Sequence, residues 1–187
     1  VLRSPYAHAK IKSIDTSAAE DAPGVITILT GSDILADGLG TTHVTQPHKR
    51  ADGSPLYSVP HPGLVLDRVR YVGDYIAFIV AETVNQAKDA AELIEIDFEP
   101  LESITNTALA LEDEAPLVWD DCENNISHMI QGGNKEATDA AFAKADKIIK
   151  HKFIINRISA NSMETRGCVG DYDRREERYI VYNDIQA

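Results

Sequence analysis

The pattern of apolar and polar residues predicts strands in the first half of the chain. Residues 9–16 alternate loosely, and Gly24–Thr30 is rich in β-branched residues and bounded by Pro-Gly before it and Gly-Ser-Asp after it. Both stretches are typical of strands. Tyr71–Ala81 is apolar nearly throughout, as the strands at the centre of a sheet are. We therefore expect a buried strand over residues 71–81.

A helix and another strand are predicted directly after residue 81. Thr83 and Gln86 have the spacing of a capping box, in which the threonine hydroxyl accepts from the Gln86 amide and the glutamine side chain reaches back. Apolar residues then recur at spacings of three and four, which gives one apolar helical face: Ala87, Ala90, Ala91 and Ile94. Glu95–Glu99 returns as a strand that Pro100 ends. A strand, a capped helix and a second strand form a layered α/β unit.

Two long stretches have no periodic pattern. Residues 37–62 carry Gly, Pro, His and Asp, which predicts a surface loop longer than a compact domain usually keeps without a function or a partner. Residues 103–133 are acidic and irregular, and we interpret them as the segment that leaves the first domain and wraps over its surface. The expected organisation is a first domain at 1–112, a linker at 113–133 and the beginning of a second domain at 134–187.

The last part of the chain predicts one helix and then strands. Lys135–Ala145 is an alanine-rich stretch typical of a short helix. Ile148–Ile155, Cys168–Tyr172 and Arg178–Gln186 follow as expected strands without a helix between them, which indicates an antiparallel meander. The fold class is therefore α/β in the broad sense that includes α+β.

Composition and charge limit the possible functions. The 187 residues are 43% hydrophobic, which suffices for one sizeable core or two small ones. The formal net charge of −12 argues against binding of nucleic acid, because nucleic-acid-binding proteins normally present a basic patch. No apolar run approaches the ~20 residues of a membrane-spanning helix, and the first residues lack the pattern of a signal peptide. Cys122 and Cys168 lie far apart, which favours two reduced thiols over a disulfide or a pair of iron–sulfur ligands.

Several groups of polar residues suggest chemistry, but each has a simpler interpretation. Three histidines of the 37–62 stretch lack the spacing of a metal site, so solvated side chains are favoured over ligands. They are His43, His48 and His61. The pairs Asp113–Glu114 and Asp120–Asp121 lie in an acidic run without an apolar pocket to raise a carboxyl pKa, so we interpret them as a solvated face. Gly132-Gly133 is a flexible turn, because its spacing differs from that of a phosphate-binding loop.

Glu164 and Arg166 are two residues apart, so on a strand they would point to the same side, where a carboxylate and a guanidinium can pair. Together with Arg157 they either shape the entrance of a cofactor site or hold a domain junction together. The second interpretation is favoured, because arginine pairs inside a protein more often order the backbone than bind a ligand.

Asn156–Gly167 reads NRISANSMETRG and is followed by two expected strands and Gln186. This order resembles the large subunits of the molybdenum hydroxylases, the family of xanthine dehydrogenase, aldehyde oxidase and aerobic-type carbon monoxide dehydrogenase. The family has an Asn-Arg…Met-Glu-x-Arg segment followed by a strand pair that ends in Thr-Gln. Here Thr165 replaces the usual proline after Met-Glu, and Asp184-Ile185 replaces the usual Ser-Thr.

The front half of the chain resembles the α/β hammerhead domain at the amino end of the same subunits. The matching segments are RSPYAHA at Arg3–Ala9, PGV at Pro23–Val25, YVGDYIAFIVAE at Tyr71–Glu82 and EIDFEPL at Glu95–Leu101. The two resemblances are independent and occur in the order that the family has. They imply a hammerhead domain followed by the first strands of a molybdopterin-binding domain.

The resemblance also implies an activity and its partners. The chain is expected to be a piece of the molybdopterin-binding catalytic subunit, similar to carbon monoxide dehydrogenase, that oxidises a small substrate with water as the oxygen source. The full-length subunit would carry molybdenum on molybdopterin cytosine dinucleotide, and this piece alone would carry none. The expected partners are an FAD-binding medium subunit and a [2Fe–2S] small subunit, in a cytoplasmic dimer of heterotrimers. The alternative is a free-standing hammerhead module that binds a partner and has no chemistry.

Gln186 is the catalytic and cofactor-binding candidate that the resemblance implies. In the family, the glutamine at this position lies beside the oxo group of the molybdenum. A neutral amide can donate a hydrogen bond to that oxygen without adding charge or competing as a ligand. No residue of this piece is expected to ligate the metal.

Overall fold

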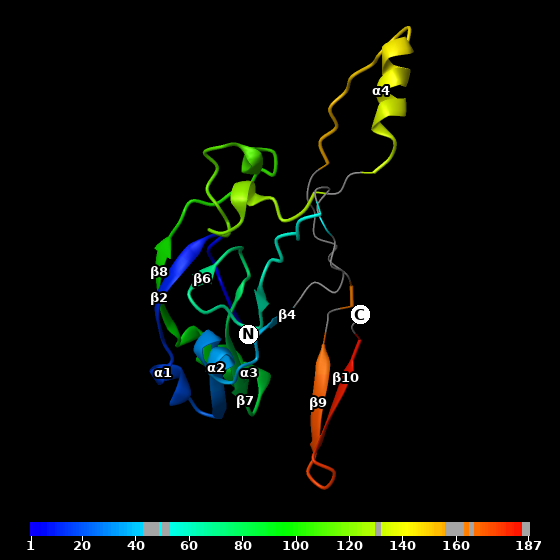
Figure 1. The fold of residues 1–187 in the computed structure, drawn as a ribbon. Helices are drawn as coiled ribbons and strands as arrows, with labels where there is room; N and C mark the ends of the chain where they lie inside the picture. Colours follow the sequence, from blue (N-terminus) through cyan, green and yellow to red (C-terminus); the bar gives the residue numbers. More distant parts are fainter. Residues whose placement is uncertain (43–48, 50–52, 130–131, 156–162, 165–166, 185–187) are drawn as a thin grey trace. The chain divides into compact units, whose positions relative to one another are not determined.

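The computed structural model describes residues 1–42, 49, 53–129, 132–155, 163–164 and 167–184. The chain divides into two compact units, an N-terminal unit of Val1–Gly133 and a C-terminal unit of Asn134–Ala187. The N-terminal unit combines helices with two three-stranded sheets, which confirms the expected mixed α and β class (Figure 1). Within the described residues, no helix is both long and apolar enough to cross a bilayer.

The first sheet has β7 (Tyr75–Ala81) as its central strand. β1 (Leu2–Arg3) and β3 (Val25–Thr30) pair with its two edges, both antiparallel. Ile76, Ala77 and Ile79 are buried, as expected of a strand that is paired on both edges and covered on both faces. The predicted strands at 24–30 and 71–81 are therefore confirmed, although β7 begins at Tyr75 and not at Tyr71.

A turn takes the place of the first residues of the predicted central strand. The Asp74 amide donates to the Tyr71 carbonyl over 3.2 Å, and Gly73 has φ +94°, which a residue with a side chain rarely adopts. The Asp74 carboxylate accepts from the backbone amides of Arg70 at 3.0 Å and Tyr75 at 3.1 Å. These bonds turn the chain sharply into β7, which the apolar pattern alone did not reveal.

The second sheet has the order β6-β2-β8. β2 (Ala9–Asp15) pairs antiparallel with both β6 (Arg68–Val69) and β8 (Glu95–Pro100), which confirms the strands predicted at 9–16 and 95–99. A further short pair joins β4 (Thr41–Thr42) to β5 (His61–Pro62) across the long stretch 37–62. Residues 43–48 and 50–52 of that stretch lie outside the described residues.

The described part of the N-terminal unit has three α-helices. α3 (Val84–Glu92) begins as predicted, because the Thr83 hydroxyl accepts from the Gln86 amide at 3.3 Å. The Gln86 side chain reaches back as predicted, and its Oε1 accepts from the Thr83 hydroxyl at 2.8 Å. α1 (Ser17–Glu20) and α2 (Gly31–Ala36) were not predicted.

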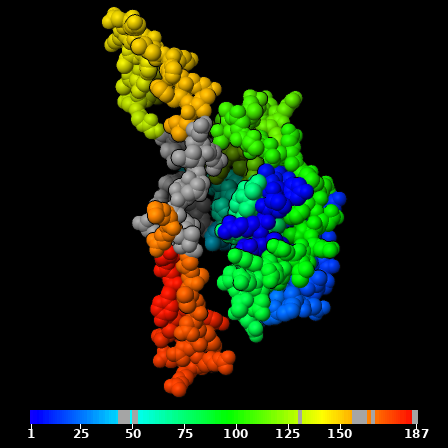
Figure 2. Space-filling view, turned by 180° about the vertical axis from the view of Figure 1, so that it is seen from behind, coloured from blue at the N-terminus to red at the C-terminus, as the bar shows by residue number. Residues whose placement is uncertain are grey.

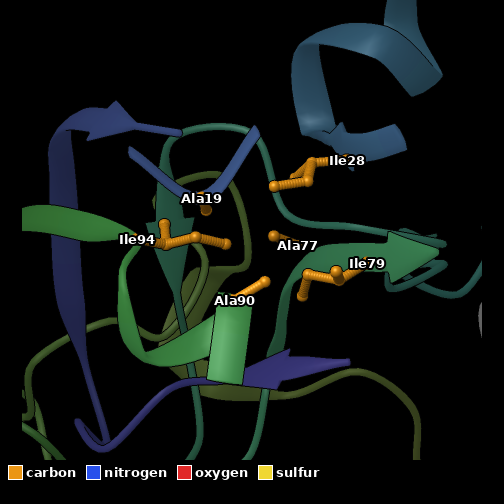
Figure 3. Packing of buried hydrophobic residues seen from close by; sticks show 6 residues of the cluster. All are labelled: Ala19, Ile28, Ala77, Ile79, Ala90 and Ile94. Atoms are coloured by element: carbon orange, nitrogen blue, oxygen red, sulfur yellow. The ribbon is translucent and has the colours of Figure 1, made fainter. Parts of the chain in front are cut away.

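The core of the N-terminal unit consists of two buried clusters. The first lies between the first sheet and the helices α1 and α3, and Figure 3 shows its six side chains, Ala19, Ile28, Ala77, Ile79, Ala90 and Ile94. The alanines leave room for the isoleucines between closely approaching elements. The second cluster joins β7 to the second sheet and comprises Ala9, Val65, Val69 and Ile76. Ile76 and Ala77 thus face different clusters from adjacent positions of β7.

The segment after β8 remains within the N-terminal unit up to Gly133. It contains two short 3₁₀ turns, η1 (Leu109–Leu111) and η2 (Glu123–Asn125). Figure 2 shows the residues of this unit, coloured from blue to green, as one continuous body. The described residues of 113–133, the stretch that the sequence suggested as a linker, belong to the first unit in the structure.

The C-terminal unit begins at Asn134, where the sequence placed the start of the second domain. α4 (Lys135–Lys144) follows the predicted helix, and its N-cap Asn134 accepts from the Ala137 amide at 2.9 Å. β9 (Cys168–Asp173) and β10 (Arg178–Asn183) form the predicted antiparallel pair. Residues 145–155 run beside α4 in both Figures 1 and 2.

The strand predicted at Ile148–Ile155 is wrong, because these residues form no strand in the structure. A strand needs a hydrogen-bonded neighbour, and the described residues provide none for this segment. Its apolar side chains are strongly exposed, including Phe153 at 81% and Ile155 at 91%. The meander of three strands is thus a hairpin of two in the described part of the unit.

Candidate functional site

The candidate site predicted from the sequence falls largely outside the described residues. Gln186, Arg157 and Arg166 all lie outside them, so the role of Gln186 and the pairing of Glu164 with Arg166 stay predictions. Met163, Glu164 and Gly167 are described, and all three are exposed. Both segments of the candidate site are attached to the hairpin β9–β10, which is described.

The hairpin β9–β10 brings the two segments of the candidate site to one end. Its register pairs Asn183 with Cys168 at the open end and Arg178 with Asp173 at the turn. At the turn, one Asp173 carboxylate oxygen accepts from the Arg175 amide at 2.9 Å and the Glu176 amide at 3.3 Å. The segment before β9 and the residues after β10 consequently start from neighbouring positions.

Asp184 fastens the open end of the hairpin. Its Oδ1 accepts from the backbone amide of Gly167 over 3.2 Å, just beyond the last strand pair. Asp184, where the family usually has serine, thus connects the two segments of the candidate site. The Gly167 end of the first segment, which contains Met163 and Glu164, is bonded to the residue two positions before Gln186. A short aspartate side chain suits this contact, since a carboxylate readily accepts from a backbone amide.

The described residues of the C-terminal unit do not enclose a cofactor. All of them are exposed except Asp173 and Ile180, which are half-buried. A site that binds a metal–pterin group needs convergent donors shielded from water, and these residues supply a hairpin without such a shell.

The N-terminal unit holds a second group of polar residues, which the sequence did not identify. Arg70 stacks on Trp119 with its guanidinium carbon 3.5 Å from the ring centroid, and Arg68 donates to Asp120 over 2.9 Å. Burial, as the largest cause, lowers the pKa of Arg70. No local sequence pattern indicated this group, because Arg68 and Arg70 contact Asp120 and Trp119, which lie far along the chain.

A cavity of about 310 Å³ lies beside this group. It is lined by Thr41, Val59, Pro60, His61, Pro62, Val65, Leu66, Asp67, Arg68, Arg70, Tyr71, Asp74, Val118 and Trp119. Both Asp74 oxygens accept from backbone amides, and Arg68 is paired with Asp120. These groups order the fold, and they do not form a nucleophile and base pair.

The other sequence candidates that are described form no metal or catalytic cluster. His61 belongs to β5 and is exposed, whereas His43 and His48 lie outside the described residues. No three His, Cys, Asp or Glu side chains gather as a metal site in the part of the chain that is described. Asp120 and Asp121 are exposed as predicted, but each also has a partner, Arg68 for the first and the Tyr57 hydroxyl for the second.

His8 is buried, with 8% of its surface exposed. Its Nδ1 lies 2.8 Å from the Glu102 carbonyl oxygen, which can only accept, so Nδ1 carries the hydrogen. Its Nε2 is buried and has no partner among the described groups. This hydrogen bond joins the RSPYAHA segment to the residues just after β8.

Two protein-family models match the chain. Residues 1–102 match the aldehyde oxidase and xanthine dehydrogenase a/b hammerhead domain. Residues 118–187 match the molybdopterin cofactor-binding domain. The matches therefore cover both units in the order expected from the sequence.

Curated proteins and solved structures are similar to nearly the whole chain. The carbon monoxide dehydrogenase large chain of Afipia carboxidovorans is 33% identical over 100% of the chain and 23% of its own length. The nicotine 6-hydroxylase large subunit of Paenarthrobacter nicotinovorans is 34% identical over 99% of the chain and 22% of its own length. The structure of reconstituted CO dehydrogenase from Oligotropha carboxidovorans is similar with a TM-score of 0.79 and 31% identity, over 97% of the chain and 23% of that protein. The chain thus spans less than a quarter of the length of these relatives.

Proposed function

The chain belongs to the aldehyde oxidase and xanthine dehydrogenase family of molybdenum hydroxylase large subunits, and we propose that the full-length protein is a molybdopterin-binding catalytic subunit. The observation that carries this proposal is the match to both family models in their proper order. A hammerhead match alone would also fit a binding module, whereas a cofactor-binding match directly after it favours an enzyme.

We propose that the enzyme resembles carbon monoxide dehydrogenase and oxidises a small substrate with an oxygen atom taken from water. The similarity to carbon monoxide dehydrogenase over 100% of the chain supports this choice. The nicotine 6-hydroxylase subunit is similar to the same extent, so a substrate assay must include both classes. Differences in substrate between such relatives arise from residues of the active site, not from the fold.

We propose molybdenum on molybdopterin cytosine dinucleotide as the cofactor, with an FAD-binding subunit and a [2Fe–2S] subunit as electron-accepting partners. The family membership supports a cytoplasmic dimer of such heterotrimers. Gln186 is proposed as the residue that donates to the oxo group. The hairpin supports this role, because Asp184 fixes the chain two residues before Gln186 to the Gly167 amide.

The test uses the full-length protein produced together with the subunits encoded beside it. Carbon monoxide, nicotine, a purine and an aldehyde are supplied in water labelled with ¹⁸O, with an artificial electron acceptor. We expect oxidation of one substrate class and transfer of ¹⁸O to its product. Transfer of ¹⁸O from dioxygen would contradict the proposal, and a complex that oxidises none of them would favour the hammerhead module without chemistry.

The form of the cofactor has its own readout. Acid hydrolysis of the purified complex should release cytidine monophosphate together with the pterin. Release of the pterin without a nucleotide would contradict the dinucleotide form and leave the rest of the proposal in place.

A further inference from the structure

The first residues of the cofactor-binding match fold against the N-terminal unit. This match starts at residue 118, whereas the C-terminal unit starts at Asn134. We propose that residues 118–127, here called the clip, anchor the start of the cofactor-binding region to the hammerhead unit, and that Arg70 is the positioning residue of this anchor. The inference does not depend on the substrate or the cofactor.

The centre of the clip is the stack of Arg70 on Trp119. The guanidinium carbon lies 3.5 Å from the ring centroid, and Arg70 Nε donates to the Val118 carbonyl over 3.0 Å. Both side chains are partly buried, which strengthens the attraction between a cation and an aromatic face. Arg70 itself is fixed, because its backbone amide donates to the Asp74 carboxylate.

The next two residues of the clip, Asp120 and Asp121, are held through their carboxylates. Arg68 donates to Asp120 over 2.9 Å, and this contact, as the largest cause, lowers the pKa of the Asp120 carboxyl. The Tyr57 hydroxyl donates to Asp121 over 2.6 Å. Burial, followed by this hydrogen bond, raises the pKa of Tyr57 to about 12, so the hydroxyl keeps its proton at neutral pH.

The far end of the clip is held by the backbone. The Tyr57 amide donates to the Ser127 carbonyl over 3.1 Å, and the Ser127 hydroxyl donates to the Tyr57 carbonyl over 3.1 Å. Tyr57 therefore contacts the clip at both Asp121 and Ser127. Cys122 lies between these two contacts and is 4% exposed.

Asn125 closes the clip on itself. Its side-chain oxygen accepts from the Val118 amide at 2.9 Å, and its Nδ2 donates to the carbonyls of Ala110 and Pro116, both at 3.1 Å. Its backbone has φ +56°, a conformation that asparagine adopts more readily than most residues. The clip is thus a closed loop fixed to three side chains of the first unit, and the junction between the units must lie after Ser127.

Trp119 reports directly on the clip, because it is the single tryptophan of the chain. In the 187-residue chain, Arg70→Met should shift the Trp119 emission to longer wavelength and raise its quenching by acrylamide toward that of the urea-unfolded chain. Arg70→Lys should behave like Arg70→Met, because lysine keeps the charge but loses the planar group that stacks. Arg3→Met is the matched control, since Arg3 lies 4.7 Å from the Tyr75 ring in the same unit and its loss should leave Trp119 emission unchanged.

Proteolysis tests where the junction lies. A glutamate-specific protease should cut the wild-type chain at Glu136, beyond the clip, well before it cuts at Glu123 inside η2. Arg70→Met should make Glu123 as susceptible as Glu136. If the wild-type chain is cut at Glu123 as fast as at Glu136, or if Arg70→Met leaves the emission unchanged, the clip is not an anchor.

A pair of charge reversals separates anchoring from simple loss of fold. Arg68→Asp should expose Glu123 to the protease, and adding Asp120→Arg should restore protection. If Arg70→Met unfolds the unit, as circular dichroism would show, this rescue decides the question. Failure of the double variant to recover protection, with its circular dichroism intact, would overturn the proposal.

Discussion

Replacing Gly31 with alanine tests how closely the start of α2 approaches the backbone of Val65 and Leu66, just before β6. A Cβ at residue 31 would lie 2.2 Å from the Val65 carbonyl oxygen and 2.8 Å from the Leu66 Cα. Both are main-chain atoms, so no side-chain rotation can relieve the overlap. To reach ordinary contact, α2 or the backbone at residues 65–66 must move by roughly 1 Å, and such overpacking costs about 1–3 kcal/mol.

The same movement would weaken the hydrogen bonds at the start of α2. The Asp33 carboxylate accepts from the Thr30 amide at 2.6 Å and the Thr30 hydroxyl at 2.8 Å, and both bonds depend on the position of the first helical turn. For a unit of this size, about 1–3 kcal/mol corresponds to a fall in melting temperature of roughly 4–12 °C. Thermal unfolding followed by circular dichroism on the 187-residue chain measures it.

Gly63→Ala is the matched control. Among the described residues, no atom outside Gly63 and its chain neighbours lies within 4 Å of the position that a Cβ would take there. An alanine there restricts the unfolded chain, so stability should stay the same or rise by about 0.4–1 kcal/mol. Equal melting temperatures for Gly31→Ala and the wild type would refute the close approach and the fold around it.

Four further outcomes follow from the structure and the proposal. Thr83→Ala removes the N-cap of α3 and should cost about 1 kcal/mol in urea unfolding, whereas Thr83→Ser should cost little. The pKa of Asp33 is lowered, mainly by the Thr30 amide, so the stability that this carboxylate contributes is present above about pH 4 and is lost as the pH falls through the lowered pKa. In Asp33→Asn, the free energy of unfolding in urea should therefore fall less between neutral and acid pH than in the wild type. Gln186→Ala in the full-length enzyme should lower turnover on the order of 10²-fold with unchanged molybdenum content, and loss of molybdenum would instead make it a binding residue. The 187-residue chain alone should hold no molybdenum and oxidise no substrate, and stoichiometric pterin on it would show the opposite.

The elements that could be predicted from the sequence are those whose local apolar pattern matches the side chains that they bury. β7 has the nearly continuous apolar run of a central strand, and α3 carries apolar residues at the period of a helix. Both contribute side chains to the cluster that contains Ala77, Ile79 and Ala90. α2 was missed because Gly-Ser-Asp was interpreted only as the end of a strand. The spacing of Thr30 and Asp33 is nevertheless that of a helix start, and in the structure the Asp33 carboxylate accepts from the Thr30 amide at the start of α2.

Tertiary contacts account for what the sequence did not predict. The contact of Arg70 with Trp119 joins residues far apart in sequence, and no local pattern indicates it. Conversely, Ile148–Ile155 has the composition of a strand but no neighbouring strand among the described residues. The candidate site rested on the resemblance alone, since a glutamine at the end of a strand has no distinguishing pattern, and Gln186 lies outside the described residues.

The metal content of the full-length protein tests the central claim most directly. The protein is purified from its native host together with the neighbouring subunits, and molybdenum and copper are measured by elemental analysis. Family membership and the two domain matches predict about one molybdenum atom per large subunit, since one molybdopterin-binding region forms one site. An intact, folded complex without molybdenum would contradict the account.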